Sequence, residues 1–311
     1  MAYFKKNQKE QHTLSVPPLF VDVSDYKRTI GSNAVVLETP TSGDNVVVLI
    51  PPTTQYSEDE IVDYEFVPLY YGTDDQILTT INKKELNNVA RLMTEFPQLK
   101  LLLTSNSDGS VTPKFDLFFS AKRAEKVAAY LVDLGVKKSN LIIKGCGANY
   151  QIAMNELESG PNLTGQRLNR RIDLTFLNDS GLPIRIIYKE PIVGKHMANE
   201  NWNYYQSSIK GLSYKIQIAS IKQMYKGDLI TTYLDPMVET SPDTDKYRYT
   251  VGLFQTFFAA EQMRRDLAKQ GVSDAFVIPY INGLRVDMDA SKIYSAAYPD
   301  LKNFIEFVEE N

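Results

Sequence analysis

The sequence predicts an α+β protein: a β-α-β-α-β-β sandwich of a sheet and helices, followed by an antiparallel sheet with helices on one face. Two observations lead to this fold class. Apolar residues at helical spacing alternate with short runs typical of strands from residue 64 onwards, and a similar alternation returns after residue 213. With 311 residues, of which 43% are hydrophobic, the chain is long enough for two hydrophobic cores.

The pattern along the chain changes at four places and so divides it into five segments. Residues 1–63 hold one plausible strand, Val46–Ile50, and have no function that we can assign. Glycines and prolines interrupt the segment between the two domains, which is typical of a connector. The predicted segments are an N-terminal extension (1–63), a first domain (64–178), a connector (179–212), a second domain (213–286) and a tail with a short helix (287–311).

Local signals place the elements of the first domain. One helix is expected over residues 84–96, where apolar residues recur at helical spacing up to Pro97. A second is expected from near Ser120 to Gly135, a residue type that commonly ends helices. The expected strands are Phe66–Tyr71, Leu99–Thr104, Leu141–Lys144 and Arg171–Phe176.

The second domain contains a repeat. Tyr214 and Tyr247, 33 residues apart, each begin a unit of tyrosine, basic residue, strand and small residue. The second unit continues into a helix that Gly271 ends, and then into a strand at Ala275–Tyr280. The helix of the first unit is less well defined, since it contains Gly227. Two β–α–β halves are expected to form one antiparallel sheet.

Composition and motifs exclude several classes of function. A net charge of −4 lacks the basic excess of nucleic-acid-binding proteins, and no run approaches the ~18 apolar residues of a membrane span. We find no Ser/His/Asp or Cys/His set and no P-loop, so we expect no enzyme and no cofactor. His12 and His196 lack the spacing of a zinc site, and we interpret Cys146 as a small buried residue. The N-terminus has no secretory signal, so a protein that acts outside the cytoplasm would be a mature form or a fragment.

Several motifs of the first domain occur in a fixed order. Phe119–Ala124, with the sequence FSAKRA, is followed by Gly135-Val136; Asn169–Arg171 precedes the last strand; and Ser107-Asp108 places an aspartate fifteen residues before Arg123. The set resembles the OmpA C-terminal domain over about 115 residues. The resemblance implies binding of the diaminopimelate in peptidoglycan stem peptides.

The same resemblance assigns roles to individual residues. Asp108 takes the ammonium group of diaminopimelate and Arg123 takes the carboxylate, for which a planar guanidinium offers two parallel hydrogen bonds. Asp74 and Asp116 stand where the family favours asparagine, so two extra carboxylates either repel the ligand's carboxylate or hold its ammonium. Arg170 is either a ligand contact or a structural ion-pair partner. The flanking family positions are Thr73, Asp74, Asp116 and Arg170.

The expected position of the second helix adds an argument about charge. If it starts near Ser120, Lys122 and Arg123 lie in its first turn, where each cation costs ~0.3–1 kcal/mol against the helix dipole. Exposed amides together with two cations would form an anion site. The alternative is that both residues are solvated surface charges.

The repeat of the second domain resembles SPOR domains, which have a ferredoxin-like antiparallel sheet and bind glycan strands stripped of stem peptides. The resemblance rests on YKIQIAS from Tyr214, on RYTVGLF from Arg248 and on the later Ala275–Ile278. Ala219 and Ile221 replace the glycine and phenylalanine of the first SPOR motif. Tyr249, Phe254 and Tyr280 are either sugar-stacking or core residues.

Together these features predict a non-catalytic protein that binds peptidoglycan and anchors an envelope assembly to the cell wall. We expect it in the periplasm, associated with the outer membrane and with other envelope proteins, in a bacterium of the Bacteroidetes group. The alternative is a protein–protein scaffold of a secretion or motility apparatus whose ligand sites are vestigial.

Overall fold

The computed structural model describes residues 60–73, 77–179, 181–200, 210–225 and 229–310, together with the backbone of three strands nearer the N-terminus. These strands form their own antiparallel sheet in the order β1-β2-β3. The predicted strand Val46–Ile50 is confirmed for Val46–Val48, and its last two residues lie outside the described ones. The bounds are β1 Lys27–Gly31, β2 Ala34–Glu38 and β3 Asn45–Val48.

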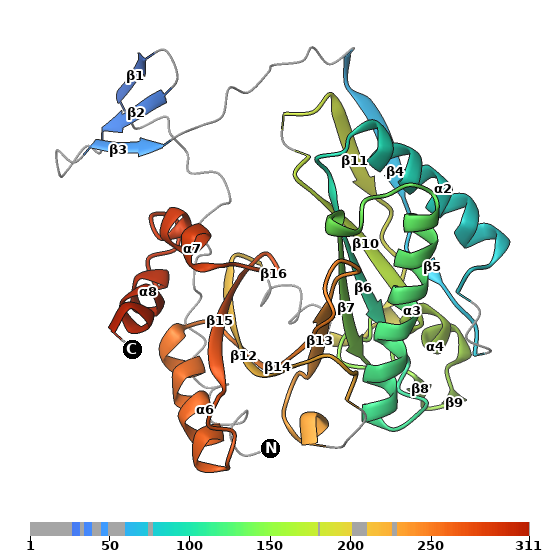
Figure 1. Cartoon of the computed structure of the whole chain (residues 1–311). Helices are drawn as coiled ribbons and strands as arrows, with labels where there is room; N and C mark the ends of the chain where they lie inside the picture. Colours follow the sequence, from blue (N-terminus) through green and yellow to red (C-terminus); the bar gives the residue numbers. More distant parts are fainter. Residues whose placement is uncertain are drawn as a thin grey trace.

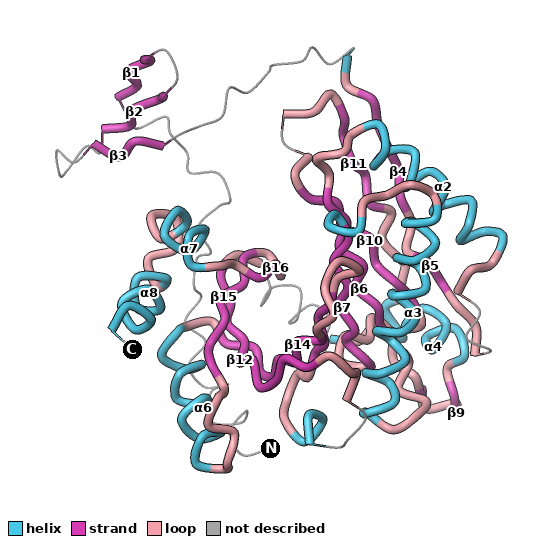
Figure 2. Tube along the Cα trace, in the orientation of Figure 1, coloured by secondary structure: helices cyan, strands magenta, loops and turns pink. Residues whose placement is uncertain are grey.

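A curled sheet of nine strands is the centre of the structure, in the order β16-β15-β12-β14-β13-β7-β6-β10-β5 (Figures 1 and 2). Parallel pairing of β6 with β7 and antiparallel pairing of β10 with β6 form the first-domain part. The strands of the second domain are all antiparallel. The predicted α+β class is confirmed. The bounds are β5 Leu69–Tyr70, β6 Lys100–Asn106, β7 Leu141–Gly147, β10 Arg171–Leu177, β12 Leu212–Ile221, β13 Met237–Thr240, β14 Tyr247–Phe254, β15 Phe276–Ile281 and β16 Leu284–Arg285.

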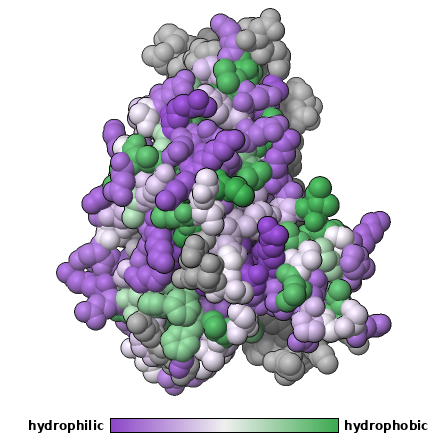
Figure 3. Space-filling view, turned by 90° about the vertical axis from the view of Figure 1, so that its right-hand side faces the viewer, coloured by the Kyte–Doolittle hydropathy of each residue, from purple (hydrophilic) through white to green (hydrophobic). Residues whose placement is uncertain are grey.

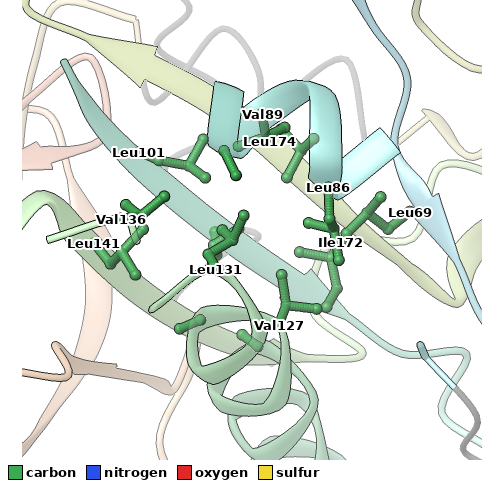
Figure 4. Close-up of a cluster of buried hydrophobic side chains, with 14 of the residues drawn as sticks. Leu69, Leu86, Val89, Leu101, Val127, Leu131, Val136, Leu141, Ile172 and Leu174 are labelled. Atoms are coloured by element: carbon green, nitrogen blue, oxygen red, sulfur yellow. The ribbon is translucent and has the colours of Figure 1, made fainter. Parts of the chain in front are cut away.

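Two long helices cover one face of the first-domain sheet. Figure 4 shows leucines and valines of α2 (Thr80–Glu95) and α3 (Pro113–Asp133) interdigitating with branched side chains of the strands. Leu86, Val127 and Leu131 are fully buried there, so their removal from water stabilises this layer. The face of the molecule in Figure 3 is mostly hydrophilic, with apolar side chains gathered in small groups. No helix among the described residues has the length and apolar character to cross a membrane.

The predicted start of the second helix is wrong. It begins at Pro113, after Thr112 in an extended conformation, because proline at the first helical position loses no hydrogen bond that the helix needs. Arg123 therefore lies in the middle of α3, where neither the dipole cost nor the anion site of a helix terminus applies. The prediction that Gly135 ends this helix is confirmed, since it has the left-handed φ of 98°.

The first helix also starts earlier than predicted. Thr79 caps it by accepting a hydrogen bond from the main chain of Asn82 at 3.2 Å. Its end before Pro97 is as predicted.

The predicted strand Phe66–Tyr71 is wrong as one element. It is divided between β4 (Val62–Phe66) and β5, because Pro68 has no main-chain N–H to continue a ladder. β4 pairs in parallel with β11 (Ile184–Tyr188), a strand within the segment that the sequence indicated as a connector.

Strand β7 extends beyond its predicted end and includes the Gly145–Gly147 segment. A Cβ at Gly145 would lie 2.7 Å from that of Ala121, so glycine is what allows α3 to approach the sheet. Cys146 is 1% exposed, as predicted, and burial raises the pKa of its thiol to about 12. The sequence did not predict the short elements that follow, which are β8 Glu156–Leu157, β9 Gly160–Pro161 and α4 Leu163–Asn169.

In the second domain the repeated strands, β12 and β14, pair directly in one sheet, as predicted. The second unit has the predicted helix, α6 (Phe257–Lys269), with Ala260 and Leu267 fully buried. In the first unit the described residues between β12 and β13 include only the 3-10 turn Leu229–Thr232. The tail contains two helices, α7 (Met288–Tyr294) and α8 (Leu301–Glu310), and α8 packs through Leu301 and Phe304 against Phe257.

The sheets of the two domains are continuous because β13 pairs with β7, placing Glu239 opposite Lys144. The Lys144 ammonium lies 3.4 Å from the Glu239 carboxylate, and both side chains are 7% exposed. Tyr280 donates a hydrogen bond of 2.6 Å to the same carboxylate. A buried polar cluster therefore joins the domains, a feature that the sequence did not predict.

Candidate ligand-binding site

The turn after β6 holds Asp108 in a fixed position. Its carboxylate accepts a hydrogen bond of 3.2 Å from the main chain of Ser110, and its main-chain oxygen accepts from the side chains of Gln151 and Asn155. The Asp108 side chain is only 4% exposed. Such a carboxylate is costly to bury unless a cation compensates its charge.

Arg170 supplies that cation. Its Nη1 lies 2.5 Å from Oδ2 of Asp108, and its Nε donates to the main-chain oxygen of Tyr71 at 3.4 Å. Arg170 thus forms an ion pair with Asp108 in the structure, and its contact with a ligand stays a prediction. An ionised carboxylate has about four lone-pair positions. Because Arg170 and Ser110 use two of them, Asp108 still has capacity to accept from a ligand's ammonium.

Arg123 is held by an aromatic ring. Its Cζ lies 4.4 Å from the centre of the Tyr71 ring, and its Nη1 donates to the Tyr71 hydroxyl at 3.1 Å. That hydroxyl donates in turn to the main-chain oxygen of Asn106, at the end of β6. Stacking on a ring suits a planar guanidinium and restricts its rotamers. Tyr71 is 3% exposed and also contacts Arg170, so one tyrosine positions both arginines.

Asp116 lies between the two predicted clamp residues. It is 3% exposed and accepts a hydrogen bond of 2.7 Å from the Ser107 hydroxyl. Burial raises the pKa of this carboxyl to about 6; the Ser107 hydrogen bond opposes the rise, the charge of Asp108 adds to it and the charge of Arg123 opposes it. Both clamp residues are thus within electrostatic reach of one buried carboxyl.

The structure accordingly brings together Asp108, Arg123, Asp116 and Arg170. Thr73 is exposed, two residues after Tyr71 in the chain, and Asp74 lies outside the described residues. The position of Arg123 depends on α3, in which Asp116, Ser120 and Arg123 share a face at helical spacing.

Sequence reasoning missed two residues that organise this site. Tyr71 was interpreted only as the end of a strand. Asn169, which is fully buried, accepts hydrogen bonds from the main chain of Ile152 and Ala153 and donates to Ala153 and Asn155. It therefore fixes the loop whose side chains hold Asp108. A buried asparagine that satisfies a loop in this way gives no sequence signal beyond its place in the Asn-Arg-Arg motif.

This arrangement of fixed opposite charges is suited to holding a zwitterion. It offers one compensated carboxylate, one oriented guanidinium and one carboxyl of raised pKa. In the part of the chain that the structure describes, no group of three or more His, Cys, Asp or Glu side chains is placed to hold a metal ion.

Residues 70–162, which include most of this site, match the model of the OmpA family. The first domain is OmpA-like. The OmpA-like resemblance inferred from the motifs is therefore confirmed, although Arg170 lies beyond the matched residues.

The chain also resembles curated proteins. The chain is 27% identical over 107 residues to the peptidoglycan-binding protein ArfA of Mycobacterium tuberculosis, covering 34% of this chain and 31% of ArfA. It is 22% identical over 157 residues to the probable lipoprotein YiaD of Escherichia coli, covering 50% of this chain and 63% of YiaD. The chain thus spans about a third of the length of ArfA and under two thirds of that of YiaD.

The fold also resembles solved structures. The peptidoglycan-associated lipoprotein from Burkholderia pseudomallei is 25% identical, with 35% of this chain and 89% of that chain covered and a TM-score of 0.32. The C-terminal domain of MotB from Helicobacter pylori is 22% identical, with coverages of 36% and 84% and a TM-score of 0.32.

Proposed function

We propose that this protein binds peptidoglycan without cleaving it, by holding the amino-acid end of diaminopimelate between Asp108 and Arg123. One observation carries the proposal. In this OmpA-like domain the half-buried, ring-stacked Arg123 lies on the same side of α3 as Asp116, a buried carboxyl whose pKa is raised in part by the charge of Asp108. The name of ArfA supports peptidoglycan as the polymer.

The two residues have different tasks in this proposal. The Arg123 guanidinium, oriented by Tyr71, holds the ligand's carboxylate in a two-point contact. The Asp108 carboxylate accepts from the ammonium through the positions that Arg170 and Ser110 leave unused. Asp116, Arg170 and Thr73 flank the ligand in this proposal, and Asp74 stays a prediction from the family resemblance.

A calorimetric titration with a diaminopimelate-containing tripeptide tests the proposal. Each charge-assisted contact contributes ~1.5–3 kcal/mol, so Arg123→Ala should weaken binding at least about tenfold. Lys126→Ala is the matched control, since Lys126 is an exposed cation one turn further along α3 and should bind like wild type. A tripeptide with lysine in place of diaminopimelate should also bind less well, because it lacks the carboxylate. Equal affinity for the two peptides would refute the clamp.

Whole sacculi test the absence of catalysis. The protein should co-sediment with purified sacculi and release no soluble muropeptides. Release of soluble fragments by the pure protein would show that it is an enzyme.

In the same proposal the second domain is SPOR-like and contacts glycan, and the protein anchors an envelope assembly from the periplasm, associated with the outer membrane. The direct pairing of the two repeated strands supports the SPOR-like assignment. The source in the Bacteroidetes group remains a prediction from the sequence. The alternative function, a scaffold with vestigial sites, is favoured by the Asp108–Arg170 pair, which satisfies part of the clamp internally. A protein that binds neither tripeptide nor sacculi would support the scaffold.

A further inference from the structure

Two exposed phenylalanines lie next to Arg123 on α3. Phe115 and Phe119 are separated by one helical turn, with ring centroids 6.0 Å apart and planes inclined by 27°, so they form a stacked pair. Both rings are partly exposed, with exposed fractions of 38% and 36%. We call this pair the phenylalanine ridge.

The ridge is continuous with the proposed clamp. The Arg123 guanidinium lies 5.8 Å from the centre of the Phe119 ring and 4.4 Å from the centre of the Tyr71 ring. Phe115 is adjacent in sequence to Asp116, and the charges of both clamp residues affect the pKa of the Asp116 carboxyl. A ligand held between Asp108 and Arg123 therefore has the ridge beside it.

We propose that the phenylalanine ridge is a second subsite, which stacks against a sugar ring of the glycan strand that carries the bound stem peptide. The inference rests on the proposed function and extends it from the peptide to the sugar. The C–H faces of an N-acetylated sugar ring are apolar and flat, and so is the face of a phenylalanine ring.

The reach of the ligand agrees with this placement. At 1.5 Å of rise per residue, Phe115 lies about 12 Å from Arg123 along the axis of α3, and Phe119 about 6 Å. Diaminopimelate is the third residue of the stem peptide, and three residues of extended chain span about 10 Å. A sugar attached to the start of the stem peptide therefore reaches the ridge while diaminopimelate occupies the clamp.

Charge next to the ridge also suits this ligand. The Lys114 ammonium lies 5.5 Å from the centre of the Phe115 ring. The stem peptide carries a free carboxylate on its second residue, between the sugar and diaminopimelate. The Lys114 cation at this end of the ridge attracts that carboxylate, whereas a ligand that is apolar and uncharged would gain no electrostatic attraction from Lys114.

The test compares two ligands on the full chain: the diaminopimelate tripeptide, and the same tripeptide attached to its disaccharide. Wild type should bind the disaccharide form about two- to tenfold more tightly, the range expected for one aromatic stacking contact. The Phe115→Leu/Phe119→Leu variant should lose this increment and bind the two ligands equally, because leucine retains apolar area but has no ring. Phe258→Leu is the control, since Phe258 is 78% exposed on α6 and should retain the increment.

The outcomes separate this inference from the proposed function. Equal wild-type affinity for the two ligands, or an increment that survives in the double leucine variant, would overturn the ridge and leave the clamp in place. Binding of the disaccharide form alone, lost in the double variant, would support the ridge and overturn the clamp. Binding of neither ligand would overturn both. Thermal unfolding of each variant verifies that the fold is retained.

Discussion

The Arg123 guanidinium lies 4.4 Å from the centre of the Tyr71 ring and donates a hydrogen bond to its hydroxyl. Tyr71 thereby sets the direction of the cation that the proposed ligand meets. The hydroxyl is itself fixed, because it donates to the main chain at the end of β6. The orientation of Arg123 thus depends on a residue 52 positions earlier in the chain.

We expect Tyr71→Phe to weaken binding of the diaminopimelate tripeptide by less than Arg123→Ala does. The ring still supports the guanidinium, but the hydrogen bond that fixes its rotation is lost, at a cost of about 0.5–1.5 kcal/mol. Tyr71→Leu should weaken binding further because the stacking is lost as well. Calorimetric titration measures the series. Phenylalanine and leucine variants that both bind like wild type would show that Tyr71 does not position the cation.

The raised pKa of Asp116 predicts that the stability of the protein depends on pH in a specific way. Its pKa is raised from 3.8 to about 6 in the folded protein, so the folded state binds this proton more tightly than the unfolded state. The contribution to stability is fully present below pH 3.8 and is lost as the pH rises to 6. A shift of about two pH units corresponds to about 3 kcal/mol. Other carboxyls titrate over the same range, so the comparison must be with a variant.

Asp116→Asn should therefore unfold at higher denaturant concentration than wild type at pH 8, and the difference should shrink between pH 6 and pH 4. Asparagine retains an oxygen that can accept from Ser107 and removes the buried charge. Urea unfolding at several pH values measures this, with Asp274→Asn as an exposed control. A difference that stays constant with pH would contradict the raised pKa.

The buried pair that joins the domains gives a prediction about stability alone. Lys144→Met should destabilise the protein by about 3–5 kcal/mol, because it leaves the Glu239 carboxylate buried without its cation. Lys144→Met/Glu239→Gln should recover part of this loss. The matched control is Lys292→Met, which breaks an exposed pair with Glu309 and should change stability little. Equal losses on chemical denaturation for Lys144→Met and Lys292→Met would show that the junction carries little energy.

Sequence reasoning recovered those elements of the fold that have a local signal. The core faces of α2, α3 and α6 follow from helical spacing, and glycines mark where α3 and α6 end. The early start of α3 also had a signal, Thr112-Pro113, that we did not weigh. The β13–β7 junction had none, because the sequence does not encode locally which strand edges pair between segments almost a hundred residues apart.

The candidate site shows the same division. Spacing and motif order singled out Asp108, Arg123 and Arg170, and the structure brings all three to the same region. Tyr71 could not be distinguished from a core residue, because a buried tyrosine at the end of a strand and one that supports an arginine have the same local pattern. The partner of Asp108 had to await the structure for the same reason, since both ligand contact and ion pair were open for Arg170.

The Asp108–Arg170 ion pair determines how much of the Asp108 charge is already neutralised within the protein, before a ligand binds. Arg170→Ala leaves a carboxylate that is 4% exposed without its cation, and we expect a loss of stability on the order of 3 kcal/mol.

If Arg170 only neutralises Asp108, the ligand's ammonium can take its place. The diaminopimelate tripeptide should then raise the melting temperature of Arg170→Ala at least as much as that of wild type, because a ligand that binds only the folded state stabilises it. If Arg170 instead holds the ligand's carboxylate, the tripeptide should stabilise the variant less than it stabilises wild type. Thermal unfolding with and without tripeptide distinguishes the two, and Arg167→Ala, an exposed arginine of α4, is the control. We expect the first result, because the 2.5 Å contact already engages the Arg170 guanidinium with Asp108, whereas the Arg123 guanidinium is oriented by its stacking on the Tyr71 ring.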